Sequence, residues 1–241
     1  MNKAKDFYSQ KENFLNYDAK YLYGKPFIDN LFDESIIKLF SSEIFSNKSV
    51  LEVGSFTGRI SKKLEKLNII FDQCDVHEHP IYKISNSNKY FQIDLSAKQF
   101  SEKKIEKYDF IICIGHQVSF SNNVELAIQN LYNLLNKGGV LIFDIPQTGS
   151  INNYDEYEFQ TCYRDEIIEI ALKNQFEIQK VIYGQTLFYH LHPYLKGEFY
   201  PLVLNSKILT KIYFFMDKYF FSKMSLLNKK SQNIYFKLQK I

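Results

Sequence analysis

Residues 50–59 read VLEVGSFTGR, and this stretch decides the fold. A run of strand length ends at Gly54, and the pattern over residues 58–67 predicts a helix directly afterwards. A strand that passes into a helix through glycine lets backbone N–H groups approach a ligand closely. The glycines stand at 54 and 58 only, so the dinucleotide-binding spacing G-x-G-x-x-G is absent, and no Gly-Lys-Ser/Thr of a P-loop follows.

The carboxylate of Glu52 lies two residues before the first glycine and restricts the kind of ligand. Its negative charge would repel a phosphate group, whereas it would favour an ammonium or sulfonium group. A purely structural role, in which Glu52 only caps the turn, is the alternative. Both alternatives stay open from the sequence.

Apolar runs of strand length alternate with helical patterns on both sides of this stretch. The predicted strands are residues 50–53, 69–75, 90–93, 110–114, 140–143, 176–183 and 234–238, and the predicted helices are 58–67, 124–135 and 167–172. Lys137-Gly138-Gly139 is predicted to end the second helix as a glycine cap. We therefore expect an α/β fold with a doubly wound, mostly parallel, seven-stranded sheet.

In such a sheet the carboxyl ends of the parallel strands lie along one edge, where ligands bind. The residues that this topology brings to the edge are Glu52-Val53-Gly54, Asp75, Asp94, Gly115-His116 and Pro146-Gln147.

Two segments lie outside the alternation of strands and helices. We predict a single domain over residues 1–241, with an N-terminal helical cap at 1–48, a ligand-binding core at 49–184, a helical insertion at 185–230 and the final strand at 231–241. Within residues 206–224 of the insertion, apolar side chains recur at helical spacing while Lys207, Lys211 and Lys218 share another face. This pattern fits a lid packed on the core, a dimer contact or a helix on a membrane surface.

Composition excludes several classes of protein. Apolar residues make up 45% of the 241 residues and charged residues 24%, which is typical of a globular domain. The net charge of +3 gives no support to nucleic-acid binding. The three cysteines form no C-x-x-C pair, so neither a disulfide framework nor a zinc site is expected. No signal peptide or membrane span is recognisable, and we expect a cytoplasmic protein that is a monomer or homodimer.

The glycine stretch resembles the first motif of the class I S-adenosylmethionine-dependent methyltransferases, an acidic residue followed by glycines at alternate positions. Glu52, Gly54 and Gly58 match, whereas Phe56 replaces the middle glycine. Further matches follow in the family's order: the entry to the fourth strand at residues 107–112, the L-x-P-G-G segment at 134–141 with Lys137 in place of proline, and the A-G-F-E turn at 174–177. The resemblance covers roughly residues 45 to 184 and the last strand.

The resemblance implies a Rossmann-like methyltransferase fold that binds S-adenosylmethionine. Asp75 corresponds to the acid that binds the ribose hydroxyls, and Asp94 to the acid that receives the adenine amino group. The cofactor-binding residues implied in this way are Glu52, Gly54, Ser55, Phe56, Gly58, Asp75, Val76, Asp94 and Leu95. Structural alternatives remain: Asp75 as a surface loop acid and Asp94 as a turn-forming aspartate.

His116 follows the fourth strand at the edge where the methyl group of the cofactor should point. A neutral imidazole there can accept a proton from an attacking hydroxyl or amine, or it can merely pack against the cofactor. Candidate substrate contacts are Tyr17, Tyr21, Gln117, Gln147, His190 and His192. No metal is expected, because no third ligand accompanies the two histidines of the insertion.

The sequence thus predicts a methyltransferase that modifies an oxygen or nitrogen of a small molecule, such as a sugar or phosphorylated precursor of a surface glycan. Methylation of DNA base amino groups is disfavoured, because Cys113-Ile114-Gly115-His116 stands where that class has Asp/Asn/Ser-Pro-Pro-Tyr/Phe. The alternatives are an inactive cofactor-binding module and a membrane-peripheral enzyme with a lipid-linked acceptor.

Overall fold

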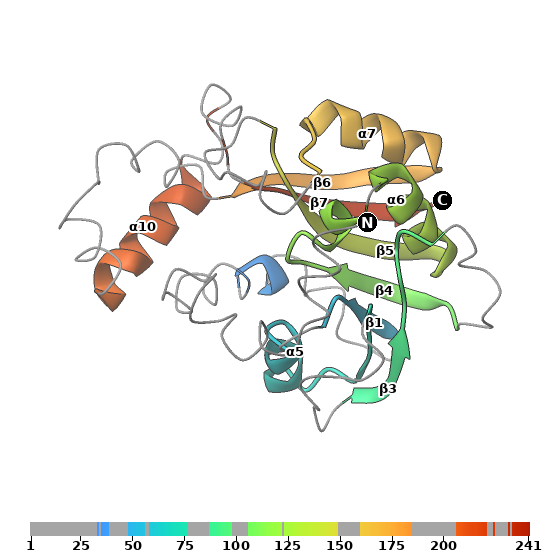
Figure 1. Cartoon of the computed structure of the whole chain (residues 1–241). Coiled ribbons are helices and arrows are strands. Elements are labelled where there is room, and N and C mark those ends of the chain that lie inside the picture. Colours follow the sequence, from blue (N-terminus) through green and yellow to red (C-terminus); the bar gives the residue numbers. More distant parts are fainter. Residues whose placement is uncertain are drawn as a thin grey trace.

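A computed structural model describes residues 33, 35–38, 48–55, 58–76, 87–97, 106–121, 123–148, 160–184, 206–220, 224, 231 and 233–241. Among these residues seven strands form one sheet in the order β3-β2-β1-β4-β5-β7-β6 (Figure 1). The strands are β1 Val50–Val53, β2 Phe71–Asp75, β3 Ser87–Gln92, β4 Tyr108–Cys113, β5 Leu135–Pro146, β6 Phe176–Gly184 and β7 Asn233–Lys240.

The sheet is mostly parallel, as predicted. Strands β1 to β5 pair in parallel with their neighbours, whereas β7 runs antiparallel between β5 and β6. The order reverses between β1 and β4, and a reversal of this kind marks the place where ligands bind in a doubly wound sheet.

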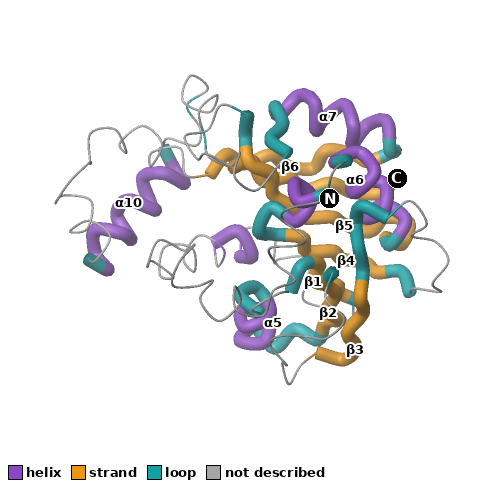
Figure 2. The backbone as a smooth tube through the Cα atoms, in the orientation of Figure 1, coloured by secondary structure: helices purple, strands orange, loops and turns teal. Residues whose placement is uncertain are grey.

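Helices cover both faces of the sheet (Figure 2). The described helices are α5 Ser61–Lys66, the 3₁₀ turn η3 Gln117–Phe120, α6 Val124–Asn133, α7 Arg164–Lys173 and α10 Lys207–Tyr219. Residues 33 and 35–38 are also helical. α6 and α7 pack into one hydrophobic core, and α5 packs into a second core with Ile36 and Ile37.

The strand β4 lies near the centre of the sheet, and from Phe110 onwards its sequence is apolar throughout instead of alternating between apolar and polar residues. Ile111 and Cys113 face the core of α6 and α7, whereas Phe110 and Ile112 face the core of α5. A strand that is covered on both faces buries every side chain, and each of these four side chains is at most 1% exposed.

The prediction that Lys137-Gly138-Gly139 caps a helix is wrong. α6 ends at Asn133, and both glycines lie within β5. Tyr108 pairs with Leu135 but Phe110 pairs with Val140, so the residues between them bulge out of the sheet. Gly138 has a φ of 75°, and a Cβ on Gly139 would lie 2.9 Å from the carbonyl oxygen of Asn136. The glycines therefore serve a bulge in the strand rather than the end of the helix.

Candidate functional site

The loop after β1 is fastened to β2. The amides of Gly54 and Ser55 donate to the carbonyl oxygen of Cys74 at 2.8 and 3.1 Å, and the amide of Gly58 donates to that of Ser55 at 2.7 Å. Gly54 and Gly58 have φ angles of 75° and 73°, a region that side chains rarely adopt. These hydrogen bonds fix the loop backbone at the carboxyl edge of the sheet.

The side chain of Gln117 lies directly over Gly54. A Cβ added to Gly54 would come within 2.1 Å of Gln117 Cδ, and Gln117 Nε2 donates to the carbonyl of Gly115 at 3.4 Å. Gly115 has a φ of 105°, and a Cβ there would lie 3.3 Å from Arg59 Nη2. The chain leaving β4 thus crosses the glycine loop, and the side chain of Gln117 packs on that loop.

The substitution Gly54→Ala is expected to destabilise the fold by about 1–2 kcal/mol, because it combines an unfavourable φ with the clash against Gln117. Adding Gln117→Ala should recover part of this loss, since it removes the clash and leaves only the backbone strain. Urea unfolding of both single variants and the double variant measures the effect. A Gly54→Ala protein as stable as the wild type would contradict the contact.

Glu52 is buried and lies against the beginning of α5. One carboxylate oxygen accepts from the amide of Ser61 at 3.1 Å, and the other pairs with the Ser61 hydroxyl. Gln73 Nε2 donates to that hydroxyl at 2.7 Å. Glu52 therefore joins β1, β2 and α5, which is the structural role that the sequence left open.

Burial, together with the nearby charge of Asp75, raises the pKa of Glu52 to about 8, although the hydrogen bonds from Ser61 oppose the shift. A carboxyl group with this pKa is mostly neutral at pH 7. A neutral Glu52 does not attract a cation, which was one of the two roles that the sequence left open.

We expect the stability conferred by Glu52 to decrease as the pH rises from about 4.5 to about 8, because the folded state holds the proton more tightly than the unfolded state. The variant Glu52→Gln keeps the shape of the side chain and removes the titration. Its melting temperature relative to the wild type should therefore be higher at the upper end of this range than at the lower end. A difference in melting temperature between the two proteins that stays constant across this pH range would contradict a buried Glu52 that holds its proton.

Asp75 and Asp94 lie at the carboxyl ends of neighbouring strands. Asp75 is the buried last residue of β2, and its carbonyl accepts from the amide of Ile93 at 2.7 Å. Asp94 Oδ1 accepts from the amide and hydroxyl of Ser96 at 2.9 and 2.5 Å, so this carboxylate closes a turn. Asp75 is thus not a surface loop acid, whereas Asp94 does form the turn that its alternative predicted.

The two residues that follow these acids also lie at this edge. The carbonyl of Val76 accepts from Gln92 Nε2 at 3.0 Å, and the carbonyl of Leu95 accepts from Asn130 Nδ2 at 2.9 Å. α6 therefore anchors the turn after β3.

His116 is held by a buried carboxylate that the sequence analysis missed. Asp144 Oδ1 accepts from the amides of Gly115 and His116 at 2.7 and 2.9 Å, and Asp144 Oδ2 lies 3.1 Å from His116 Nδ1. Burial alone would raise the pKa of Asp144, but the neighbouring imidazole and these hydrogen bonds lower it below its usual value. A carboxylate this close to Nδ1 orients the imidazole ring.

The backbone at His116 adopts the left-handed region, with a φ of 62°. Strained backbone of this kind persists where the surrounding structure holds it, and it often marks a functional site. The hydrogen bonds from the amides of Gly115 and His116 to Asp144 hold the backbone in this conformation.

Gln147 and Asp33 lie at two further places around this edge. Gln147 is buried, pairs with Cys162 as a bridge, and accepts from the Ser231 hydroxyl at 2.5 Å, so its carbonyl connects β5 to the chain before β7. Asp33 is buried and pairs with Arg59 Nε at 2.9 Å and Lys63 Nζ at 2.8 Å, which fastens the N-terminal helix to α5. The sequence analysis did not foresee the role of Asp33.

Some predicted residues lie outside the described part of the chain, namely Tyr17, Tyr21, Phe56, His190 and His192. Of the others, the structure brings Glu52, Gly54, Ser55, Gly58, Asp75 and Gln117 together around the loop after β1. His116 joins them through its neighbour Gln117. Within the described residues, no three His, Cys, Asp or Glu side chains gather in a way that could hold a metal ion.

Residues 51–141 match the family model of a methyltransferase domain. No curated protein matches the chain. A solved methyltransferase of Thermotoga maritima, named a possible histamine N-methyltransferase, shares 16% identity and a TM-score of 0.60, covering 99% of this chain and 100% of that one. Magnesium protoporphyrin IX methyltransferase of Synechocystis, solved with bound S-adenosylmethionine, shares 13% identity and a TM-score of 0.59, covering 100% and 98%.

A phosphoethanolamine N-methyltransferase of Haemonchus contortus, in complex with S-adenosyl-L-methionine, gives a TM-score of 0.62 at 14% identity, covering 98% of this chain and 60% of that one. In fold the chain is similar to the class I S-adenosylmethionine-dependent methyltransferases, and residues 51–141 match the model of a methyltransferase domain. The predicted fold and the predicted resemblance to this family are thereby confirmed.

The described residues are compatible with S-adenosylmethionine. Gly54 has no side chain of its own and is covered by the side chain of Gln117, so a ligand that displaces Gln117 can lie directly on the Gly54 backbone. The carboxylate of Asp75 stands at the next strand end and supplies two acceptors for neighbouring hydroxyls. His116 follows the carboxyl end of β4, which lies beside β1 in the sheet.

Proposed function

We propose that this methyltransferase transfers a methyl group from S-adenosylmethionine to an oxygen or nitrogen of a small molecule. The single observation that carries the proposal is the pair of His116 and Asp144, 3.1 Å apart, beside the glycine loop. An imidazole that a carboxylate orients at this strand end supports proton transfer, whereas a module that only binds the cofactor requires no such pair.

The loop backbone at Gly54 and Ser55 would hold the methionine portion of the cofactor, and Asp75 would bind the ribose hydroxyls. Asp94 and Leu95 would lie toward the adenine, with the Asp94 carboxylate already engaged by Ser96. S-adenosylmethionine, when bound, supplies a methyl group on a positively charged sulfur. Gln117 must leave Gly54 for the ligand to reach the backbone, which makes its side chain a contact of the bound state.

His116 would then act as the general base. As the acceptor oxygen or nitrogen bonds to the methyl carbon and the carbon–sulfur bond breaks, the acceptor proton passes to His116 Nε2. Asp144 stabilises the positive charge that this transfer creates on the imidazole. The rest of the catalysis is positional, because the site must hold the acceptor, the carbon and the sulfur in line.

Two classes of small acceptor fit this reaction. Fold neighbours named as N-methyltransferases favour a small amine, whereas a sugar or phosphorylated glycan precursor remains the acceptor that the sequence suggested. The low net charge supports a small acceptor over a nucleic acid.

The test is transfer of a labelled methyl group from S-adenosylmethionine into a fractionated small-molecule extract, with mass identification of the labelled compound. We expect label in a small molecule from the wild type and a much weaker signal from His116→Ala. Label only in macromolecules would contradict the proposed substrate class. Cofactor binding without transfer to any fraction would contradict the proposed activity and favour a binding module.

A further inference from the structure

The helix α10 carries a large apolar face that is exposed to solvent. Every member of this face is between 39% and 72% exposed. The α10 apolar face consists of Ile208, Leu209, Ile212, Phe215, Met216, Tyr219 and Phe220. Exposed apolar surface of this extent marks an interaction site.

Two ring contacts lie within this face. The ring of Phe215 lies 4.7 Å from that of Tyr219 and 6.3 Å from that of Phe220. At 100° per residue the seven positions span an arc of about 140° along a helix of about 20 Å. Such an arc is wider than the narrow seam of a coiled coil and resembles a helix lying in a water–apolar boundary.

Charge indicates which apolar boundary this is. Residues 207–230 contain six lysines and a single acidic residue, Asp217. Lys207, Lys211 and Lys218 fall within an arc of about 40° beside the α10 apolar face. A second copy of this helix would bring like charges together, whereas an anionic lipid surface would attract them.

We propose that the α10 apolar face docks on the surface of a bilayer that contains anionic lipids. The apolar side chains enter the boundary between head groups and acyl chains, and the lysines pair with the head groups. Among the described helices, none has the length and apolar character needed to cross a bilayer, so α10 lies on the surface rather than through it.

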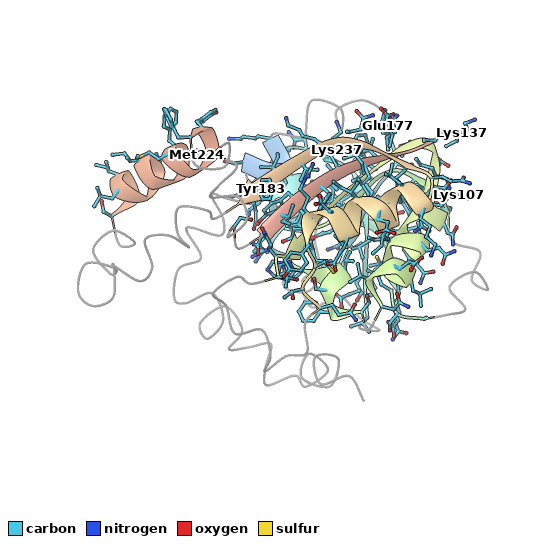
Figure 3. The ribbon with its side chains drawn as sticks, turned by 90° about the horizontal axis from the view of Figure 1, so that it is seen from above. Lys107, Lys137, Glu177, Tyr183, Met224 and Lys237 are labelled. Atoms are coloured by element: carbon cyan, nitrogen blue, oxygen red, sulfur yellow. The ribbon has the colours of Figure 1, made fainter. Side chains whose placement is uncertain are left out.

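The position of α10 connects this docking to the candidate site. α10 lies in the connection between β6 and β7, which leaves the sheet at the carboxyl edge (Figure 1). Figure 3 shows α10 and Met224 beyond the end of β6 that carries Tyr183, whereas Lys107 and Lys137 mark the opposite end of the sheet. Docking through α10 therefore takes place beyond the carboxyl edge, the edge that carries His116.

The experiment is co-sedimentation of the full chain with vesicles of phosphatidylcholine mixed with phosphatidylserine, and with vesicles of phosphatidylcholine alone. We expect binding to the mixed vesicles that weakens with salt. Phe215→Glu combined with Phe220→Glu should weaken the affinity for the mixed vesicles by about tenfold or more. Loss of the burial of a single aromatic ring is enough for a change of this size. Binding needs no cofactor, so this result stands apart from the proposed activity.

A matched control places the same two charges on other exposed apolar residues. Ile70 and Leu172 are 63% and 59% exposed and precede the amino ends of β2 and β6. Ile70→Glu combined with Leu172→Glu should bind vesicles as the wild type does. The proposal is overturned if the wild type binds neither kind of vesicle or binds both kinds equally. It is overturned as well if the variant with Phe215→Glu and Phe220→Glu binds as strongly as the wild type. It is also overturned if the α10 substitutions instead dissociate a dimer.

Discussion

Asp75→Ala is expected to abolish the rise in melting temperature that S-adenosylhomocysteine gives to the wild type. A ligand at 100 times its dissociation constant stabilises a protein by about 2.7 kcal/mol, and this is the signal that should disappear. In the proposed site the buried carboxylate at the end of β2 binds the ribose hydroxyls through its two acceptor oxygens, so the substitution removes both hydrogen bonds.

Asp109→Ala is the matched control for this experiment. Asp109 lies in β4 near its amino end, where it accepts from the amide and hydroxyl of Ser49 at 3.0 Å and from Asn136 at 2.9 Å. Its loss should lower the melting temperature of the free protein and leave the rise on ligand addition intact. A full ligand response in Asp75→Ala would show that the cofactor, if bound, lies elsewhere.

The second large effect concerns the base. His116→Ala should lower kcat by about 10²-fold or more while the response to S-adenosylhomocysteine persists, because the imidazole removes a proton and does not hold the cofactor. Turnover close to that of the wild type would mean that His116 is not the base.

Asp144→Asn provides a sharper form of the same test. The amide keeps an acceptor for the backbone at Gly115 and His116, but its NH₂ group donates to His116 Nδ1 and so places the proton on Nε2. That tautomer cannot accept a proton from the acceptor, so kcat should fall about as far as in His116→Ala. The double variant should be no slower than either single variant, since the two side chains act as a unit. Additive losses would indicate two separate roles.

The sheet could be predicted because apolar runs of strand length are a local signal in the sequence. The run at residues 110–114 contains no charged or strongly polar residue, and a short run of this kind is typical of a strand that is covered on both faces. The bulge at Gly138 and Gly139 could not be predicted, because a glycine pair after a helical pattern is equally typical of a helix end. The choice depends on the pairing of β4 with β5, which is a long-range contact.

The candidate site was predictable in position but not in contacts. Glu52 lies where the motif places it, yet its carboxyl group binds Ser61, since the direction of a strand side chain depends on the helix packed over it. Asp144 was missed although an acid within the apolar run 140–145 is a visible anomaly. Its role depends on the register that places Cys113 opposite Phe143, which brings Asp144 beside the chain leaving β4.

The most direct test of the central claim is equilibrium dialysis of the chain against labelled S-adenosylmethionine with unlabelled competitors. Saturable binding that S-adenosylhomocysteine displaces, and that neither NADH nor ATP displaces, is the predicted result. Failure to retain the label, or its displacement by the nicotinamide or nucleotide competitor, would contradict a methyl-donor site at the carboxyl edge of this sheet.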